Sequence, residues 1–289
     1  MAGTVRYAIE HVSRYRYASR VRRCAMLLCL EPRGDRGQRL LHFGIETRPP
    51  GGLSRERDSF GNVRHVLDVH EGHRVLEITA RSTVESAPAP VLPEHLGASA
   101  WQEIHALGTS FADWEFVHPS PLIPSTAALP AFVERHRIKP GRDPLESLGR
   151  LSETLHQRLF YVPGATSAES PVDHALRTDR GVCQDFAHVM IAIARSWGIP
   201  ARYVSGYLHV TARTGDRVPD NATHAWVECR LPGLGWVGFD PTNRSLAGAG
   251  HVHIATGRDY RDVSPTRGIV HGGGEARLEV EVRVRTDDG

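Results

Sequence analysis

A short motif, residues 181–188 (GVCQDFAH), runs directly into an apolar segment that ends at Trp197, and this stretch sets narrow limits on the local structure. Its large apolar side chains recur at spacings of three and four, which predicts a helix with a buried face. These side chains are Phe186, Met190, Ile193 and Trp197. Gly198 and Pro200 follow, so the helix should end there. Counting back from that end places Cys183 in or just before the first turn.

Cys183 is therefore predicted to lie at a helix N-terminus. The unpaired N–H groups and the positive end of the helix dipole stabilise a thiolate at such a position, which favours a nucleophilic cysteine. A free cysteine is often just a small buried apolar residue, and Cys183 taken alone fits either role. The choice depends on which groups the fold brings beside it.

A histidine and an aspartate follow in a suitable arrangement. His224 lies at the start of a predicted strand, residues 223–231, and Asp240 ends the next strand, residues 235–240. The short connection between them is typical of an antiparallel pair, in which the start of one strand lies beside the end of the next. Pro241 also favours extended backbone at Asp240. The sequence thus predicts a thiol, an imidazole and an orienting carboxylate, which is the set that acyl transfer needs.

Four motifs in this half of the chain resemble those of the bacterial transglutaminase-like family, which is part of the papain-like cysteine-enzyme group. They are residues 181–188 (GVCQDFAH), 198–207 (GIPARYVSGY), 224–228 (HAWVE) and 238–242 (GFDPT). The turn at 58–62 (DSFGN) resembles the family's N-terminal β domain, and residues 257–260 (GRDY) with 264–265 (SP) resemble its C-terminal segment. The resemblance covers nearly the whole chain. It implies that the family's catalytic residues correspond to Cys183, His224 and Asp240.

Residues 1–86 are predicted to form the N-terminal β domain. Apolar residues alternate with polar ones in five segments, beginning near Val5, Met26, Leu41, Val63 and Val75, with turn residues between them. Short strands at this spacing are typical of an antiparallel sandwich or barrel-like sheet. Three prolines between residues 87 and 93 then indicate a linker.

Three further parts follow the β domain. Residues 87–142 are predicted to be a linker with helices near 99–112 and 126–137. Residues 143–270 would form the transglutaminase-like core, which opens with a helix that Asp143 caps and Pro144 begins. Residues 271–289 hold a last strand, for which a return to the N-terminal sheet is one option. The expected fold class is α+β: an antiparallel β-sandwich-like domain joined to a papain-like core whose nucleophile helix packs on an antiparallel sheet.

Several residues near the predicted site are candidates for substrate contact, and each has a simpler interpretation. Gln184 follows the nucleophile and is either a donor to substrate or an exposed residue at the helix start. Tyr203 and Tyr207 share one side of a predicted strand and would line a substrate groove or pack in the core. Trp226 is a weaker candidate, since tryptophan at such a position is more often core. His188 lies five residues beyond Cys183, about 140° around the helix, so it is not a suitable base.

Composition and charge exclude some classes of function. The chain has 35 basic and 33 acidic residues, a net charge of +2, and no basic run. We therefore expect neither nucleic acid nor an anionic membrane as partner. The N-terminus lacks an apolar leader, and the four cysteines do not form a disulfide framework, which together favour the cytoplasm. The pairs His70/His73 and His251/His253 lack further ligands at zinc-site spacing, and no EF-hand loop is present. No metal or other cofactor is expected.

The resemblance leaves the reaction open. A Cys-His-Asp set supports hydrolysis of peptides or amides, deamidation, and amine transfer of the protein-glutamine gamma-glutamyltransferase kind, since all pass through a thioester and differ in what attacks it. Hydrolysis of a peptidase or amidase type is the preferred expectation, because nothing in the sequence resembles the extra domains of the calcium-dependent animal crosslinking enzymes. Amine transfer is the first alternative, and a catalytically degenerate peptide-binding scaffold is the second. The expected partner is a peptide or protein substrate, and the sequence does not define an oligomeric state.

Overall fold

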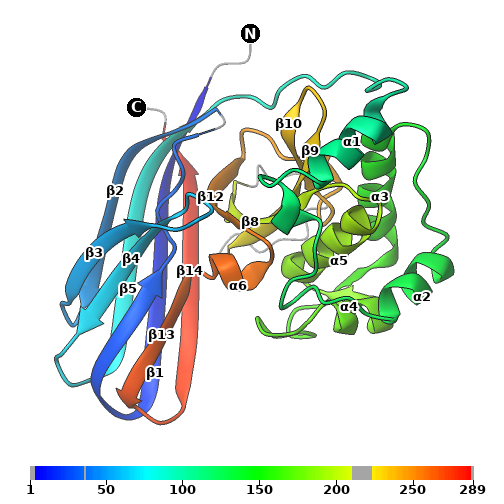
Figure 1. Ribbon diagram of the computed structural model, residues 1–289. Coiled ribbons are helices and arrows are strands. Elements are labelled where there is room, and N and C mark those ends of the chain that lie inside the picture. The colour runs from blue at the N-terminus through cyan, green and yellow to red at the C-terminus, as the bar shows by residue number, and fades with distance from the viewer. Residues whose placement is uncertain (1–3, 36, 210–222, 288–289) are drawn as a thin grey trace.

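The computed structural model of the 289-residue chain describes residues 4–35, 37–209 and 223–287 (Figure 1). An antiparallel sheet from the N-terminal part lies beside a second unit of helices and strands, and the chain crosses between them after Ser86. The chain has an α+β fold, as the sequence predicted. None of the described helices is both long and apolar enough to cross a lipid bilayer.

The N-terminal sheet is built around one long strand, β1 (Val5–Leu28). Its first half pairs with β5 (His73–Ser86) and β14 (Ala276–Thr286), and its last residues pair with β4 (Val63–Val69) and β13 (Thr266–Gly272). The outer strands β2 (Gln38–Arg48) and β3 (Gly52–Arg57) pair with β5 and β4. Because β1 runs through both halves, the sheet curls around it (Figure 1).

The separate strands expected near Val5 and Met26 are in fact this single strand. The residues between them, Ala18, Ser19 and Arg20, are all exposed at the bend, so the apolar alternation is interrupted while the backbone stays extended. The register against β5 also shifts between Arg16 and Val21. A bend of this kind separates the pairing partners of the two halves but does not end the strand.

The helical segment begins with α1 (Ala100–Gly108), a short 3₁₀ turn η1 (Trp114–Phe116) and α2 (Ala128–Arg135). Both helices are shorter than the expected ranges 99–112 and 126–137. The next helix, α3 (Pro144–Arg158), begins as predicted, since the Asp143 carboxylate accepts hydrogen bonds from the N–H groups of Leu145 and Glu146.

The second unit is organised around α5 (Cys183–Ser196), which packs on a five-stranded antiparallel sheet in the order β11-β10-β9-β8-β12. The strands are β8 (Ala201–Leu208), β9 (His224–Leu231), β10 (Gly235–Asp240), β11 (Ser245–Leu246) and β12 (His251–Gly257). Residues 185–195 of α5 are buried on every side rather than on one face. The helix ends as predicted, with Gly198 at φ +79°.

Smaller elements complete this unit. The helix α4 (Asp173–Thr178) precedes α5, and α6 (Tyr260–Val263) follows β12. The two-residue strands β6 (Phe160–Tyr161) and β7 (Arg180–Gly181) pair in parallel, which places Tyr161 beside the start of α5.

The N-terminal sheet is attached to β12, an outer strand of the second sheet. The side-chain amide of Gln38 donates to the carbonyl of His253 at 2.8 Å and accepts from its N–H at 2.8 Å. Asn62, in the 58–62 turn, does the same with Thr256, at 2.7 and 2.8 Å. Two side-chain amides thus satisfy backbone groups along the outer edge of β12, where a further strand would otherwise pair.

Candidate functional site

Cys183 is the first residue of α5, and its neighbours fix the start of that helix. Asp185 folds back so that its Oδ2 accepts the Val182 N–H at 2.8 Å and the Thr166 hydroxyl at 2.6 Å. Burial raises the pKa of Asp185, and these two hydrogen bonds oppose that shift. A Cβ atom at Gly181 would lie 2.4 Å from the Asp185 Cβ, so this position needs glycine.

The four cysteines are free, and they differ in exposure. Cys183 is partly exposed, whereas Cys24, Cys29 and Cys229 are buried. Burial raises the pKa of Cys29 to about 12, which keeps that thiol protonated. Cys183 is therefore the cysteine that combines solvent access with a helix N-terminus.

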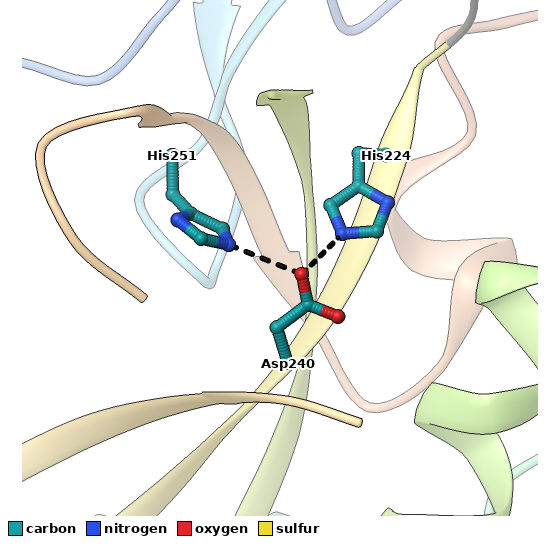
Figure 2. A group of neighbouring side chains, drawn as sticks. All are labelled: His224, Asp240 and His251. Atoms are coloured by element: carbon teal, nitrogen blue, oxygen red, sulfur yellow. Dashed lines mark hydrogen bonds and ion pairs between the residues drawn. The ribbon is translucent and has the colours of Figure 1, made fainter. Parts of the chain in front are cut away.

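His224 and Asp240 form a buried pair at the ends of β9 and β10. The His224 Nε2 lies 2.7 Å from the Asp240 Oδ2, and neither side chain is exposed. The other ring nitrogen, Nδ1, points away from Asp240 (Figure 2) and has no nitrogen or oxygen partner among the described residues. With Nε2–H donated to the carboxylate, a neutral ring presents an unprotonated Nδ1 as its base.

Electrostatics connect this pair to Cys183. Burial alone would lower the pKa of His224, but the charge and hydrogen bond of Asp240, followed by the Cys183 side chain, outweigh it and raise the pKa to about 10. Burial likewise opposes the charged form of Asp240, yet His224 and then His251 hold the pKa of that carboxyl well below its usual range. The arrangement thus favours the protonated form of His224, which lies between the Asp240 carboxylate and the Cys183 side chain.

Asp240 accepts more hydrogen bonds than the sequence predicted. Its Oδ1 accepts the N–H groups of Thr242 and Asn243 at 3.0 and 3.2 Å. Its Oδ2 accepts the Asn243 side-chain amide at 2.9 Å and contacts the His251 Nε2 at 3.2 Å, in addition to His224. Sequence reasoning missed both Asn243 and His251. Asn243 directly follows the GFDPT motif, but His251 is eleven residues beyond Asp240, and its spacing from His253 points only to a candidate zinc site.

The donor atoms of His224, Asp240 and His251 lie within 4.8 Å of one another, which is compatible with a metal ion by distance alone. The chemistry of these atoms opposes that use. The Nδ1 of His251 accepts the Gly248 N–H at 3.1 Å, so a neutral His251 ring carries its proton on Nε2, the atom that faces Asp240. Both nitrogens that face the carboxylate are then hydrogen-bond donors rather than free ligands.

Tyr161 is a further residue beside Cys183 that sequence reasoning missed. Burial, followed by the nearby Cys183, raises the pKa of Tyr161 to about 12. The parallel pairing of β6 with β7 brings it there, and a two-residue strand leaves almost no pattern in the sequence. His188, excluded above as the base, is fully buried and its Nε2 accepts the Tyr260 N–H at 3.2 Å. Burial lowers the pKa of His188 to about 4, so the ring stays neutral.

The four candidates for substrate contact occupy different environments. Gln184 is partly exposed, and its amide donates to the Ala168 carbonyl at 3.2 Å. Tyr203 is buried between His188 and Tyr260, and Trp226 is buried against His224 and His251. Tyr207 is also buried, and its hydroxyl bonds to His11 of the N-terminal sheet at 3.0 Å. Burial favours packing roles for the three aromatic residues, and their contact with substrate stays a prediction.

Comparisons with known proteins identify the family to which this fold belongs. A model of the transglutaminase-like superfamily matches residues 134–241, and a model of the bacterial transglutaminase-like N-terminal region matches residues 7–85. An uncharacterised protein of Mycobacterium leprae is 32% identical over 281 residues, covering 96% of this chain and 98% of the relative. An uncharacterised protein of Mycobacterium tuberculosis is 32% identical over 311 residues, covering 98% and 94%.

Two further matches are to proteins whose names mention a class of enzyme. A protein-glutamine gamma-glutamyltransferase of Pseudomonas aeruginosa is 37% identical over 92 residues, which are 30% of this chain and 14% of that protein. The crystal structure of a candidate cysteine protease from Cytophaga hutchinsonii shares the fold, with a TM-score of 0.77, 20% identity, and coverage of 100% of this chain and 92% of that one. The two family models and the full-length relatives together show that the chain belongs to the bacterial transglutaminase-like family, with both the N-terminal region and the core of that family present.

Proposed function

We propose that the protein is a cysteine enzyme that hydrolyses amide or peptide bonds through Cys183, His224 and Asp240. The observation that carries this proposal is the buried His224–Asp240 pair, whose free Nδ1 and raised pKa connect it to a partly exposed thiol at a helix N-terminus. A buried charged pair is costly to maintain, which supports a role in chemistry over a degenerate scaffold.

The proposed reaction has two halves. The proton of the Cys183 thiol is held on the His224 Nδ1 before attack, and the Sγ then bonds to the substrate carbonyl carbon. The tetrahedral intermediate breaks its C–N bond, and Nδ1 returns the proton to the leaving amine, which leaves a thioester. Water then attacks the thioester carbon and gives a proton to Nδ1. Cleavage of the C–S bond then releases the acid and leaves the sulfur beside the protonated Nδ1, as at the start.

Asp240 and the start of α5 would support both halves. Asp240 keeps Nε2 protonated, so that Nδ1 is the atom that gains and loses the proton. The backbone N–H of Cys183 belongs to the first turn of α5, where N–H groups have no partner within the helix. It is therefore suited to bind the oxyanion, the site at which stabilisation contributes most to acyl transfer.

Hydrolysis is the first candidate because Cys183 is partly exposed, so water can reach a thioester formed there. Amine transfer is the second candidate, since the matched segment of the Pseudomonas aeruginosa gamma-glutamyltransferase is related to this chain. In either reaction a peptide or protein is the proposed substrate. The proposed compartment is the cytoplasm, where a reducing environment would keep Cys183 as a thiol.

The two reactions can be separated by mass spectrometry. The protein and its Cys183→Ala variant would be incubated with a library of short peptides, including glutamine-containing ones, with and without an added primary amine. Hydrolysis predicts cleaved or deamidated peptides whose yield does not depend on the amine and which disappear in the variant. Amine-linked products that require Cys183 would show that the reaction is amine transfer rather than hydrolysis. Products that persist in Cys183→Ala would contradict both.

A further inference from the structure

His251 lies outside the proposed catalytic set, yet it contacts the Asp240 atom that His224 uses. The two rings approach Oδ2 of Asp240 from opposite sides (Figure 2), with His224 Nε2 at 2.7 Å and His251 Nε2 at 3.2 Å. We propose that His251 is a positioning residue, whose Nε2–H holds the Asp240 carboxylate in the orientation that receives His224. This inference rests on the proposed function.

The proton on His251 is placed by the backbone rather than by Asp240 alone. The Gly248 N–H donates to the His251 Nδ1 at 3.1 Å, so Nδ1 is an acceptor and the proton of the neutral ring is on Nε2. His251 is therefore preset as a donor toward Asp240. The same second hydrogen bond fixes the plane of the ring, in the way that outer partners orient histidines in metal sites.

Apart from the two histidines, the described donors to Asp240 all lie in one short segment of the chain. Oδ1 is held by the N–H groups of Thr242 and Asn243, which lie in the turn that directly follows β10. The third contact from this turn, the Asn243 side-chain amide, reaches Oδ2 at 2.9 Å. All of these donors come from one short segment, so they move together with Asp240. Besides His224 on β9, His251 contacts the carboxylate from another strand, β12, and it anchors the carboxylate to the sheet.

Packing holds the two histidines at a fixed separation. The Trp226 ring lies against both, with centroid distances of 5.2 Å to His251 and 6.1 Å to His224. Trp226 in turn lies over Gly206, where a Cβ atom would be 2.4 Å from the Trp226 Cη2 and 2.2 Å from the Val252 carbonyl oxygen. This lack of free space limits rotation of the indole, which keeps the His251 ring facing Asp240.

The position of β12 is itself fixed by the N-terminal sheet. Gln38 bonds to both backbone groups of His253, two residues after His251, and the Arg33 N–H donates to the His253 carbonyl at 3.0 Å. A chain of contacts therefore connects the N-terminal region to the proposed triad: Gln38 bonds to β12, and His251 is the first residue of β12. Positioning of a general base to within about 1 Å can change a rate by about a hundredfold, so such support has consequences for catalysis.

Two substitutions separate hydrogen bonding from packing. His251→Gln keeps a side-chain amide donor of similar reach, whereas His251→Phe keeps a ring against Trp226 but removes the donor. The probe is iodoacetamide, and the readout is the rate of Cys183 carboxymethylation in the folded protein at pH 7 and pH 9. This readout needs no knowledge of the substrate. Thermal unfolding of both variants checks that they are folded.

The proposal predicts that His251→Phe lowers the alkylation rate at pH 7 by about tenfold. It also predicts that the ratio of the rate at pH 7 to the rate at pH 9 is smaller in this variant than in the original protein. The reason is that a displaced Asp240 no longer stabilises the His224 imidazolium that pairs with the thiolate. His251→Gln should stay within about threefold of the original rate at both pH values, the cost of a less rigid donor. Where the library experiment supplies a substrate peptide, kcat should fall in His251→Phe with little change in KM.

Three results would overturn the inference. One is an unchanged rate in a folded His251→Phe variant, and another is an equal loss in both variants, which would assign His251 to packing alone. The third is one equivalent of bound metal that both variants lose, because Nε2 would then be a ligand rather than a donor. Failure of the proposed function gives a different result from failure of this inference. If the proposed function is wrong, the protein without any substitution already shows no enhanced alkylation of Cys183.

Discussion

The residue that decides the chemistry is His224, because it connects a partly exposed thiol to a buried carboxylate. Its Nε2 bonds to the Asp240 carboxylate, and its Nδ1 has no nitrogen or oxygen partner among the described residues. The pKa of about 10 means that the folded protein holds a proton on His224 across the neutral range. This bound proton also makes the stability of the folded state depend on pH.

Stability should therefore fall as pH rises above the ordinary histidine range. The pKa of His224 is raised from 6.5 to about 10 in the folded state, so the folded protein binds this proton more tightly than the unfolded chain. The contribution to stability is complete below pH 6.5 and is lost as pH rises toward 10, with a slope of at most about 1.4 kcal/mol per pH unit. Urea unfolding at pH 6, 8 and 9.5 would measure it.

The matched control is His224→Gln, which removes the titrating group and keeps a side-chain amide near Asp240. Other groups also titrate in this range, so the test is the difference between the two proteins rather than the slope of either. We expect the difference in unfolding free energy to shrink as pH rises. A difference that is constant from pH 6 to 9.5 would show that His224 gains no proton affinity on folding.

At the scale of elements, β12 connects the N-terminal sheet to the site. Its outer edge is satisfied by the side-chain amides of Gln38 and Asn62, and its first residue is His251. Gln38 is itself 7% exposed, so the His253 backbone groups that it binds would meet little water if it were shortened. The strand therefore depends on a side chain from a distant part of the sequence.

Gln38→Ala should lower the free energy of unfolding by about 1–3 kcal/mol, since it leaves the buried N–H of His253 without its partner, although the His253 carbonyl keeps the Arg33 N–H. Gln157→Ala is a suitable control, because Gln157 is exposed on α3 and its amide lies 3.4 Å from Glu153. Gln157→Ala should change the free energy of unfolding by no more than about 0.5 kcal/mol. Equal effects of the two substitutions, measured by chemical denaturation, would contradict the role assigned to Gln38.

The sequence predicts the elements whose signals are local and misses those that depend on distant contacts. The limits of α5 follow from apolar spacing and from Gly198, and the neighbourhood of His224 and Asp240 follows from an antiparallel connection of three residues. His251 could not be predicted in the same way, because β12 pairs with β8 across a long stretch of chain. Similarly, the unbroken β1 could not be seen, since its exposed bend has no apolar alternation.

At the scale of the whole molecule, the two units share a buried boundary. The Tyr207 hydroxyl of β8 bonds to His11 of β1, and burial lowers the pKa of His11 to about 4, so that ring is neutral. The last strand, β14, returns to pair with β1 from Tyr7 to Tyr17, so the first and last described strands lie in the N-terminal sheet (Figure 1). The second unit is thus enclosed in sequence between strands of the first.

This arrangement predicts a single cooperative unfolding transition. All five tryptophans lie between residues 101 and 236, in the second unit, so fluorescence reports on that unit, while far-ultraviolet circular dichroism reports on both. The two denaturation curves should coincide. Tyr207→Phe should lower the unfolding free energy by about 1–3 kcal/mol in both curves alike, because it leaves the buried His11 Nδ1 without its partner. Curves that separate would show that the two units unfold independently.

The central claim is that His224 activates Cys183, and the most direct measurement is the rate at which iodoacetamide alkylates Cys183 at pH 7. Because Cys24, Cys29 and Cys229 are buried, selectivity within the chain is a weak comparison, and a free thiol such as glutathione at the same pH is the better reference. The account predicts that Cys183 reacts about tenfold faster than glutathione, and that His224→Ala removes this excess. A Cys183 that reacts no faster than glutathione, or a rate unchanged by His224→Ala, would contradict it.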